Sequence, residues 1–206
     1  MAKARLEAFS DGVIAILITI MVLELKVPHG ADWPTLRALT PVFLTYILSF
    51  IYLGIYWNNH HHMMHAADRI NGKVLWANLH LLFWLSLIPF VTGWMGENHF
   101  APLPTAVYGG VLLLAGGAYT ILQALLVAAQ GPGSRLATAV GDDLKGKLSL
   151  GLYVLAIPLA FLTKWIAEAI YIVVALIWLV PDPRIESRLT DHQAVRPAEG
   201  AGGASR

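Results

Sequence analysis

The chain alternates between long apolar stretches and short polar connections, and this pattern predicts its architecture. Six apolar stretches stand out, at about residues 9–25, 40–57, 74–94, 106–129, 148–162 and 166–180. A membrane-spanning helix takes about 20 apolar residues, and its backbone must be hydrogen-bonded internally because lipid offers no partners. The two-residue alternation of a membrane β-barrel is absent. The sequence therefore predicts an all-α integral membrane protein with six transmembrane helices.

The composition agrees with this interpretation and excludes several other classes of protein. Hydrophobic residues make up 57% of the chain and charged residues 13%, whereas soluble domains carry about 25% charged residues. The net charge is +1 and no basic patch stands out, so a nucleic-acid partner is not expected. The chain has no cysteine, which excludes disulfides and thiolate metal sites. No bound cofactor is predicted.

The distribution of lysine and arginine predicts the orientation in the membrane. With six spans, one side carries eleven of the 14 cations, namely Lys3, Arg5, Arg69, Lys73, Arg135, Lys145, Lys147, Arg184, Arg188, Arg196 and Arg206. The other side carries the remaining three, Lys26, Arg37 and Lys164. Because positive residues concentrate on the cytoplasmic side, both termini are predicted to lie in the cytoplasm.

The two ends of the chain differ in character. The start is basic and then apolar, as in a signal peptide, but Asp11 interrupts it and no small-residue cleavage site follows, so we expect the segment to be retained. From residue 181 onward the chain is polar. We expect a six-helix membrane domain over residues 1–183 and a disordered cytoplasmic tail over residues 184–206.

The first span carries acidic residues at both ends. Only residues 12–23 separate Asp11 from Glu24, a helical length of roughly 18 Å against a bilayer core of ~30 Å. Asp11 is therefore predicted to lie at or below the membrane surface, where a carboxylate needs hydrogen-bond donors. Donors at the same level are Trp57, Asn58, Asn59, His60 and His61 at the end of the second span, with Asn78 and His80 at the start of the third.

A helical wheel of the first span places Gly12, Ile16, Thr19, Ile20 and Leu23 on one stripe. A stripe facing lipid has no need of a glycine or a threonine, whereas a helix packed against other helices, or lining a pore, can use both. On wheel geometry alone, ordinary helix packing is the simpler interpretation, and a pore wall is the alternative.

Three motifs carry a resemblance to a known family. The first span contains Arg5-x-x-x-Phe9-Ser10-Asp11, the second ends in YWNNHHHMMH, and the third contains NLHLLFWLSLIPFVT. Together they resemble the transmembrane protein 175 family, specifically its single-repeat bacterial branch, and the resemblance covers about residues 5–183. It implies a potassium-permeable homotetramer in the bacterial inner membrane, whose partners are other copies of the chain, potassium ions and lipid.

The resemblance also implies roles for particular residues. The first helix of each subunit would line a central pore, with Ile16 as the narrowest ring and with Ile20 and Leu23 as further layers. Thr19 would supply a hydroxyl layer that favours potassium over sodium. Ala15 stands where some relatives carry a second hydroxyl, so we expect modest selectivity. The Thr-Val-Gly-Tyr-Gly carbonyl filter of ordinary potassium channels is absent.

The Arg-x-x-x-Phe-Ser-Asp motif of the first helix is expected to be structural rather than conductive. We expect Asp11 to be a buried acceptor in a network between helices. The predicted network comprises Arg5, Phe9, Ser10, Asp11, Trp57, His60 and Asn78.

Other functions find less support in the sequence. His61 and His65 have the spacing of metal ligands, but no carboxylate lies within the run, so an interfacial helix end is the preferred interpretation and no metal site is predicted. No paired carboxylates or activated nucleophile lie within the spans, so an enzyme is not predicted. The alternative function is a secondary transporter for a cation or small solute, which would require broken helices and inverted repeats.

Overall fold

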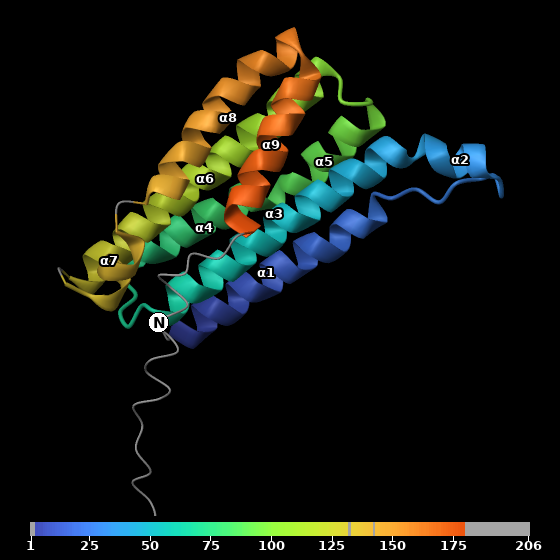
Figure 1. The fold of residues 1–206 in the computed structure, drawn as a ribbon. Coiled ribbons are helices and arrows are strands. Elements are labelled where there is room, and N and C mark those ends of the chain that lie inside the picture. Colours follow the sequence, from blue (N-terminus) through green and yellow to red (C-terminus); the bar gives the residue numbers. More distant parts are fainter. Residues whose placement is uncertain (1–2, 132, 142, 180–206) are drawn as a thin grey trace, which may run out of the picture.

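The computed structural model describes residues 3–131, 133–141 and 143–179, and the regular elements in this part of the chain are α-helices joined by short connections (Figure 1). Its elements are α1 (Lys3–Leu23), α2 (Trp33–Ala38), α3 (Thr40–His65), α4 (Gly72–Ser86), α5 (Ile88–Glu97), α6 (Pro102–Gln130), α7 (Arg135–Val140), α8 (Leu144–Leu162) and α9 (Lys164–Leu179). The all-α fold predicted from the sequence is confirmed. The tail predicted for residues 184–206 lies outside the described residues.

The predicted spans correspond to these helices. Within the described residues, five segments are long and apolar enough to cross a membrane, and α4 with α5 forms the third of them over Gly72–Glu97. The helix α9 corresponds to the sixth predicted span, but it has 16 residues, which is shorter than a typical span of about 20. The count of six spans therefore stays a prediction.

Proline explains the interruption of the third span. Helix α4 ends at Ser86 and α5 begins at Ile88, with Pro89 in its first turn. Leu87 between them keeps a helical conformation, with φ −85° and ψ −13°. Backbone bonds also continue across it, from Leu87 N–H to the Trp84 carbonyl and from Val91 N–H to the Leu87 carbonyl. The third span is therefore kinked, as a proline predicts, and it is not unwound.

The helices form a bundle around α6, which packs against α4, α5, α8 and α9. Figure 1 shows α1 on one flank of the bundle and α8 on the opposite flank. Helix α1 packs against α3, α4 and α5 and therefore buries only one of its sides within the subunit. The start of α1 lies beside the end of α3, because Lys3 reaches the His65 carbonyl.

Buried tyrosines cross-link the middle of the bundle. The Tyr52 hydroxyl on α3 donates to the Tyr171 carbonyl on α9 at 2.6 Å, and the Tyr171 hydroxyl donates to the Thr105 carbonyl on α6 at 3.1 Å. Ser49 shares a hydrogen bond of 3.0 Å with the Tyr108 hydroxyl. In an apolar interior such bonds fix the rotation of each helix, because a hydroxyl left without a partner is unfavourable.

Glycine allows the closest of these contacts. A Cβ atom on Gly109 would lie 2.8 Å from Cζ of Tyr171, whereas a Cβ on the adjacent Gly110 would meet no atom within 4 Å. We expect Gly109→Ala to lower the free energy of unfolding by about 1–3 kcal/mol, because Tyr171 must move away from Thr105. Gly110→Ala is the matched control and should be neutral or stabilising, since alanine is the better helix former. Thermal unfolding in detergent measures both, and equal midpoints would contradict the expected difference.

Candidate functional site

Helix α1 has two different sides. Its buried residues follow a helical spacing of three or four and face the bundle: Leu6, Ser10, Ile14, Leu17 and Met21. The opposite side is open in the single subunit, although it is equally apolar. Such a side must be covered by lipid or by another protein surface, since water would not cover it favourably.

The open side contains the residues that the sequence assigns to the pore. The exposed fraction is 56% for Ile16, 39% for Ile20 and 78% for Leu23. Thr19 lies between them and is also exposed, and its hydroxyl donates to the Ile16 carbonyl at 2.8 Å. The hydroxyl proton is thus used within the helix, and the oxygen lone pairs remain available as acceptors. The structure brings these four residues onto one open strip, and their role as a constriction stays a prediction.

A network of buried polar groups holds the other side of α1. The Ser10 side chain is fully buried, donates to the Leu6 carbonyl at 2.9 Å and accepts from Asn78 Nδ2 at 2.9 Å. Asn78 Oδ1 in turn lies 2.7 Å from Nε2 of His60, which is buried as well. Since Asn78 donates to Ser10 through its amide nitrogen, its oxygen accepts and His60 carries its proton on Nε2. Each of these groups is satisfied, and the network joins α1, α3 and α4.

The remaining members of the predicted network lie nearer the surface. Asp11 Oδ1 accepts a hydrogen bond of 3.1 Å from Trp57 Nε1, so the aspartate is an acceptor between helices. Asp11 is only partly buried, however, whereas the neighbouring Ser10 is fully buried. Phe9 is 52% exposed, and Arg5 is exposed without a hydrogen bond or ion pair to the described residues. The anchoring role of the whole motif stays a prediction.

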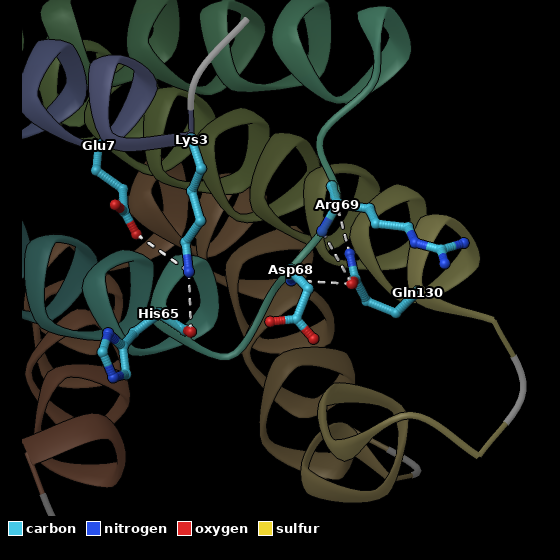
Figure 2. A network of polar contacts seen from close by, with 6 residues as sticks. All are labelled: Lys3, Glu7, His65, Asp68, Arg69 and Gln130. Carbon is cyan, nitrogen blue, oxygen red and sulfur yellow. Dashed lines mark hydrogen bonds and ion pairs between the residues drawn. The ribbon is translucent and has the colours of Figure 1, made fainter.

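A second network fixes the loop between α3 and α4 (Figure 2). The Gln130 side chain at the end of α6 accepts from the N–H groups of Asp68 and Arg69, at 2.9 and 3.1 Å, and donates to the Arg69 carbonyl at 2.9 Å. Lys3 donates to the His65 carbonyl at 3.0 Å and lies 3.7 Å from Glu7. Sequence reasoning missed this clamp, although Gln130 is a lone polar residue at the end of an apolar run.

The histidine-rich end of α3 is an exposed aromatic ladder. Trp57 stacks on His61 with 5.9 Å between ring centroids, and His61 stacks on His65 at 6.2 Å. Among the described residues, no group of three or more potential ligands is placed to hold a metal ion.

The other end of α1 meets α5 at a crevice of about 410 Å³ that Ile20, Glu24, Phe90 and Glu97 help to line. Lys26 forms an ion pair with Glu97 at its rim. Lys26 also donates a hydrogen bond to Glu97. This bond and the negative charge of Glu97 raise the pKa of Lys26 above its usual range, so the lysine keeps its positive charge.

These features define a multi-pass membrane protein. The open side of its first helix is suited to assembly with other subunits or to the conduction of ions. Comparison with known proteins narrows this class. The family model "Endosomal/lysosomal potassium channel TMEM175" matches residues 5–89. A potassium channel of Chryseobacterium sp. (strain P1-3) is 54% identical over 192 residues, which cover 93% of this chain and 100% of the relative.

Two further comparisons involve Chamaesiphon minutus. A potassium channel of that organism is 30% identical over 188 residues, covering 84% of this chain and 91% of the relative. The crystal structure of a lysosomal potassium-selective channel TMEM175 homolog from this organism matches with a TM-score of 0.77 and 28% identity. The match covers 86% of this chain and 96% of that one. The chain belongs to the TMEM175 family, as its sequence motifs predicted.

Proposed function

We propose that the chain is a potassium channel, modestly selective over sodium, in which the first helices of four identical subunits surround a shared pore. The open side of α1 is the observation that carries this proposal. Ile16, Ile20 and Leu23 are exposed along it, while the opposite side of α1 is packed against α3, α4 and α5. The names of the full-length bacterial relatives support potassium as the permeant ion.

The chemistry of the strip fits a hydrophobic constriction followed by a hydroxyl layer. Rings of isoleucine exclude water from a narrow pore, and a hydrophobic constriction gates by dewetting. An ion that passes must shed part of its hydration shell, which disfavours sodium more than potassium because sodium holds its water more tightly. Thr19 is exposed one turn beyond Ile16, and its free lone pairs can coordinate a partly dehydrated cation. The strip thus combines a gate with a weak binding layer.

The competing proposal is a secondary transporter, which would have discontinuous helices with unwound backbone at mid-membrane. The interruption between α4 and α5 is the candidate feature. Leu87 remains helical there and backbone hydrogen bonds continue across it, so the span has no unwound stretch of backbone of the kind that coordinates an ion in such transporters. This continuity favours the channel.

Thr19→Val tests both the channel and its hydroxyl layer. In planar bilayers with potassium on one side and sodium on the other, the wild-type current should be passive and should reverse towards the potassium equilibrium potential. Removing the hydroxyl should move the reversal potential towards zero, because the lone pairs that bind potassium are lost. Thr19→Ser keeps the oxygen and serves as the control. Coupled, slow flux in the wild type would contradict the channel, and unchanged selectivity in Thr19→Val would contradict the role of Thr19.

A further inference from the structure

A carboxyl group lies inside the subunit, away from α1 and the proposed pore. Glu168 is on the inner side of α9 and only 7% of it is exposed. Its Oε1 atom is buried and has no hydrogen-bond partner among the described residues. An acid in a membrane-embedded bundle is unfavourable unless it serves a function or finds a partner. The proposed conduction mechanism does not use this residue.

The cation one turn away does not pair with this carboxyl group. Lys164 acts on Glu168 electrostatically, but its ammonium group donates to the His99 carbonyl at 2.8 Å and lies 5.2 Å from the ring centroid of Trp165. The ion pairs within the described residues are Lys3–Glu7 and Lys26–Glu97, and neither includes Glu168. The interior carboxyl group therefore has no direct counter-ion.

A second orphaned polar group faces the same helix contact from α6. Thr105 is fully buried, and its hydroxyl oxygen also has no hydrogen-bond partner among the described residues. The Thr105 carbonyl accepts a hydrogen bond from Tyr171, which is one turn beyond Glu168 on α9. This bond places Thr105 and the turn of Glu168 at neighbouring levels of the contact between α6 and α9. Two buried polar groups therefore lie at one helix contact without a hydrogen bond to the described residues, and together they offer a place for an occupant.

The packing restricts what that occupant can be. At the same contact, Gly109 lies so close to the Tyr171 ring that even one added carbon atom would overlap it. A hydrated metal ion needs space that such tight packing does not provide, whereas a proton needs none. A proton on Glu168 removes the buried charge and supplies a donor. The Thr105 hydroxyl is not hydrogen-bonded to Glu168 in the structure, and we expect it to become the acceptor once the carboxyl group is protonated and its side chain rotates.

Opposing influences make this proton exchangeable. Burial favours the neutral carboxylic acid, while Lys164 and the positive ends of α6 and α9, which begin at Pro102 and Lys164, favour the carboxylate. The titratable residues that contact Tyr171 or Lys164 at this place are Tyr52 on α3, Tyr108 on α6, Tyr153 on α8 and, through its backbone carbonyl, His99 before α6. The tyrosines are neutral at physiological pH, so His99 is the group that must be controlled for.

We propose that Glu168 and Thr105 form an interior proton-binding site in each subunit, separate from the face of α1, which couples pH to the packing of α9 on α6. Protonated, the site is neutral and the contact is tight. When the proton leaves, an unpaired carboxylate remains between the helices and the contact is weakened. The proposal does not depend on ion conduction.

Infrared spectroscopy of the full chain in lipid tests the protonation directly. At neutral pH the wild type should have a carbonyl band of a protonated carboxylic acid, which Glu168→Gln should remove. Thr105→Val should shift that band to higher frequency, because the acid loses its acceptor. A wild type without the band, or a band that survives Glu168→Gln, would overturn the proposal. The wild-type measurement and Thr105→Val keep the test decisive even if Glu168→Gln fails to fold.

Thermal unfolding across pH tests the consequence. The wild-type midpoint should fall by roughly 4–8 °C as the pH rises from about 5 to about 9, and Glu168→Gln should abolish most of this fall. The midpoint falls with rising pH because the charged carboxylate is disfavoured by burial only in the folded chain. Alkaline conditions therefore favour unfolding. Glu97→Gln and His99→Gln are the controls and should keep the wild-type profile. A Glu168→Gln profile that parallels the wild type would overturn the coupling.

Discussion

Ile16→Asn should increase the potassium flux of reconstituted proteoliposomes by about tenfold or more and weaken selectivity over sodium. A tenfold increase corresponds to roughly 1.4 kcal/mol removed from the barrier. Ile16 is 56% exposed on the open side of α1, and in the proposed assembly it forms the tightest apolar ring. An amide at that level can hydrogen-bond to water, so the constriction stays hydrated and an ion crosses it with less dehydration. Fluorescence-monitored flux with potassium or sodium gradients measures both effects.

A matched substitution separates this effect from the general cost of an amide in the membrane. Ile121 on α6 is 48% exposed, and Ile121→Asn therefore introduces the same change at a similar exposure away from α1. We expect its flux to remain at the wild-type level. If Ile16→Asn also behaves as wild type, or if both variants conduct more, then Ile16 does not form the constriction.

Asn78→Leu should destabilise the protein more than any other single change in the polar network. Asn78 is fully buried and bonds to both Ser10 and His60. A leucine of similar size removes the donor to the Ser10 oxygen and the acceptor of His60 Nε2, both in buried surroundings, at roughly 1–3 kcal/mol for each lost bond. In a chain of this length that corresponds to a fall of roughly 5–15 °C in the thermal midpoint. Unfolding followed by fluorescence size exclusion measures it and also reports whether assembly is lost.

Asn59→Leu is the corresponding control, at the residue before His60 on α3. Asn59 is partly buried, and its amide donates to the Ile55 carbonyl of its own helix, so its loss leaves no side chain without a partner. We expect a change of less than about 1 kcal/mol, which is the net contribution of an ordinary hydrogen bond. Similar losses in the two variants would mean that Asn78 does not hold α1 in place.

The periodicity of the sequence was sufficient for the class of this protein, and the resemblance of its motifs to a known family was sufficient for the family. Long apolar stretches separated by polar breaks predicted the helices. The motif around Ser10 and Asp11 pointed to partners on the second and third spans, since charges at membrane depth restrict the choice of donors. Which of the two residues is fully buried depended on the rotation of α1, which a helical wheel does not determine.

Contacts between distant segments could not be predicted in the same way. Gln130 binds a loop some sixty residues earlier, at sequence separations of 62 residues from Asp68 and 61 from Arg69, and no local pattern specifies that pairing. Glu168 was also overlooked, because one acid within an apolar helix does not reveal whether it faces lipid, water or the interior. A helical wheel of α1 likewise separates its two sides, but it does not identify what covers the open side. That depends on how the subunits assemble.

The clamp around Gln130 has a mechanical consequence for the first helix. A surface loop is usually pliable because its backbone groups exchange freely with water, yet in the loop after α3 one amide side chain occupies the N–H groups of Asp68 and Arg69. The start of α1 rests on the carbonyl of His65, directly before that loop. We therefore expect a tilt of α6 to displace this loop and, through the bond between Lys3 and His65, the start of the first helix.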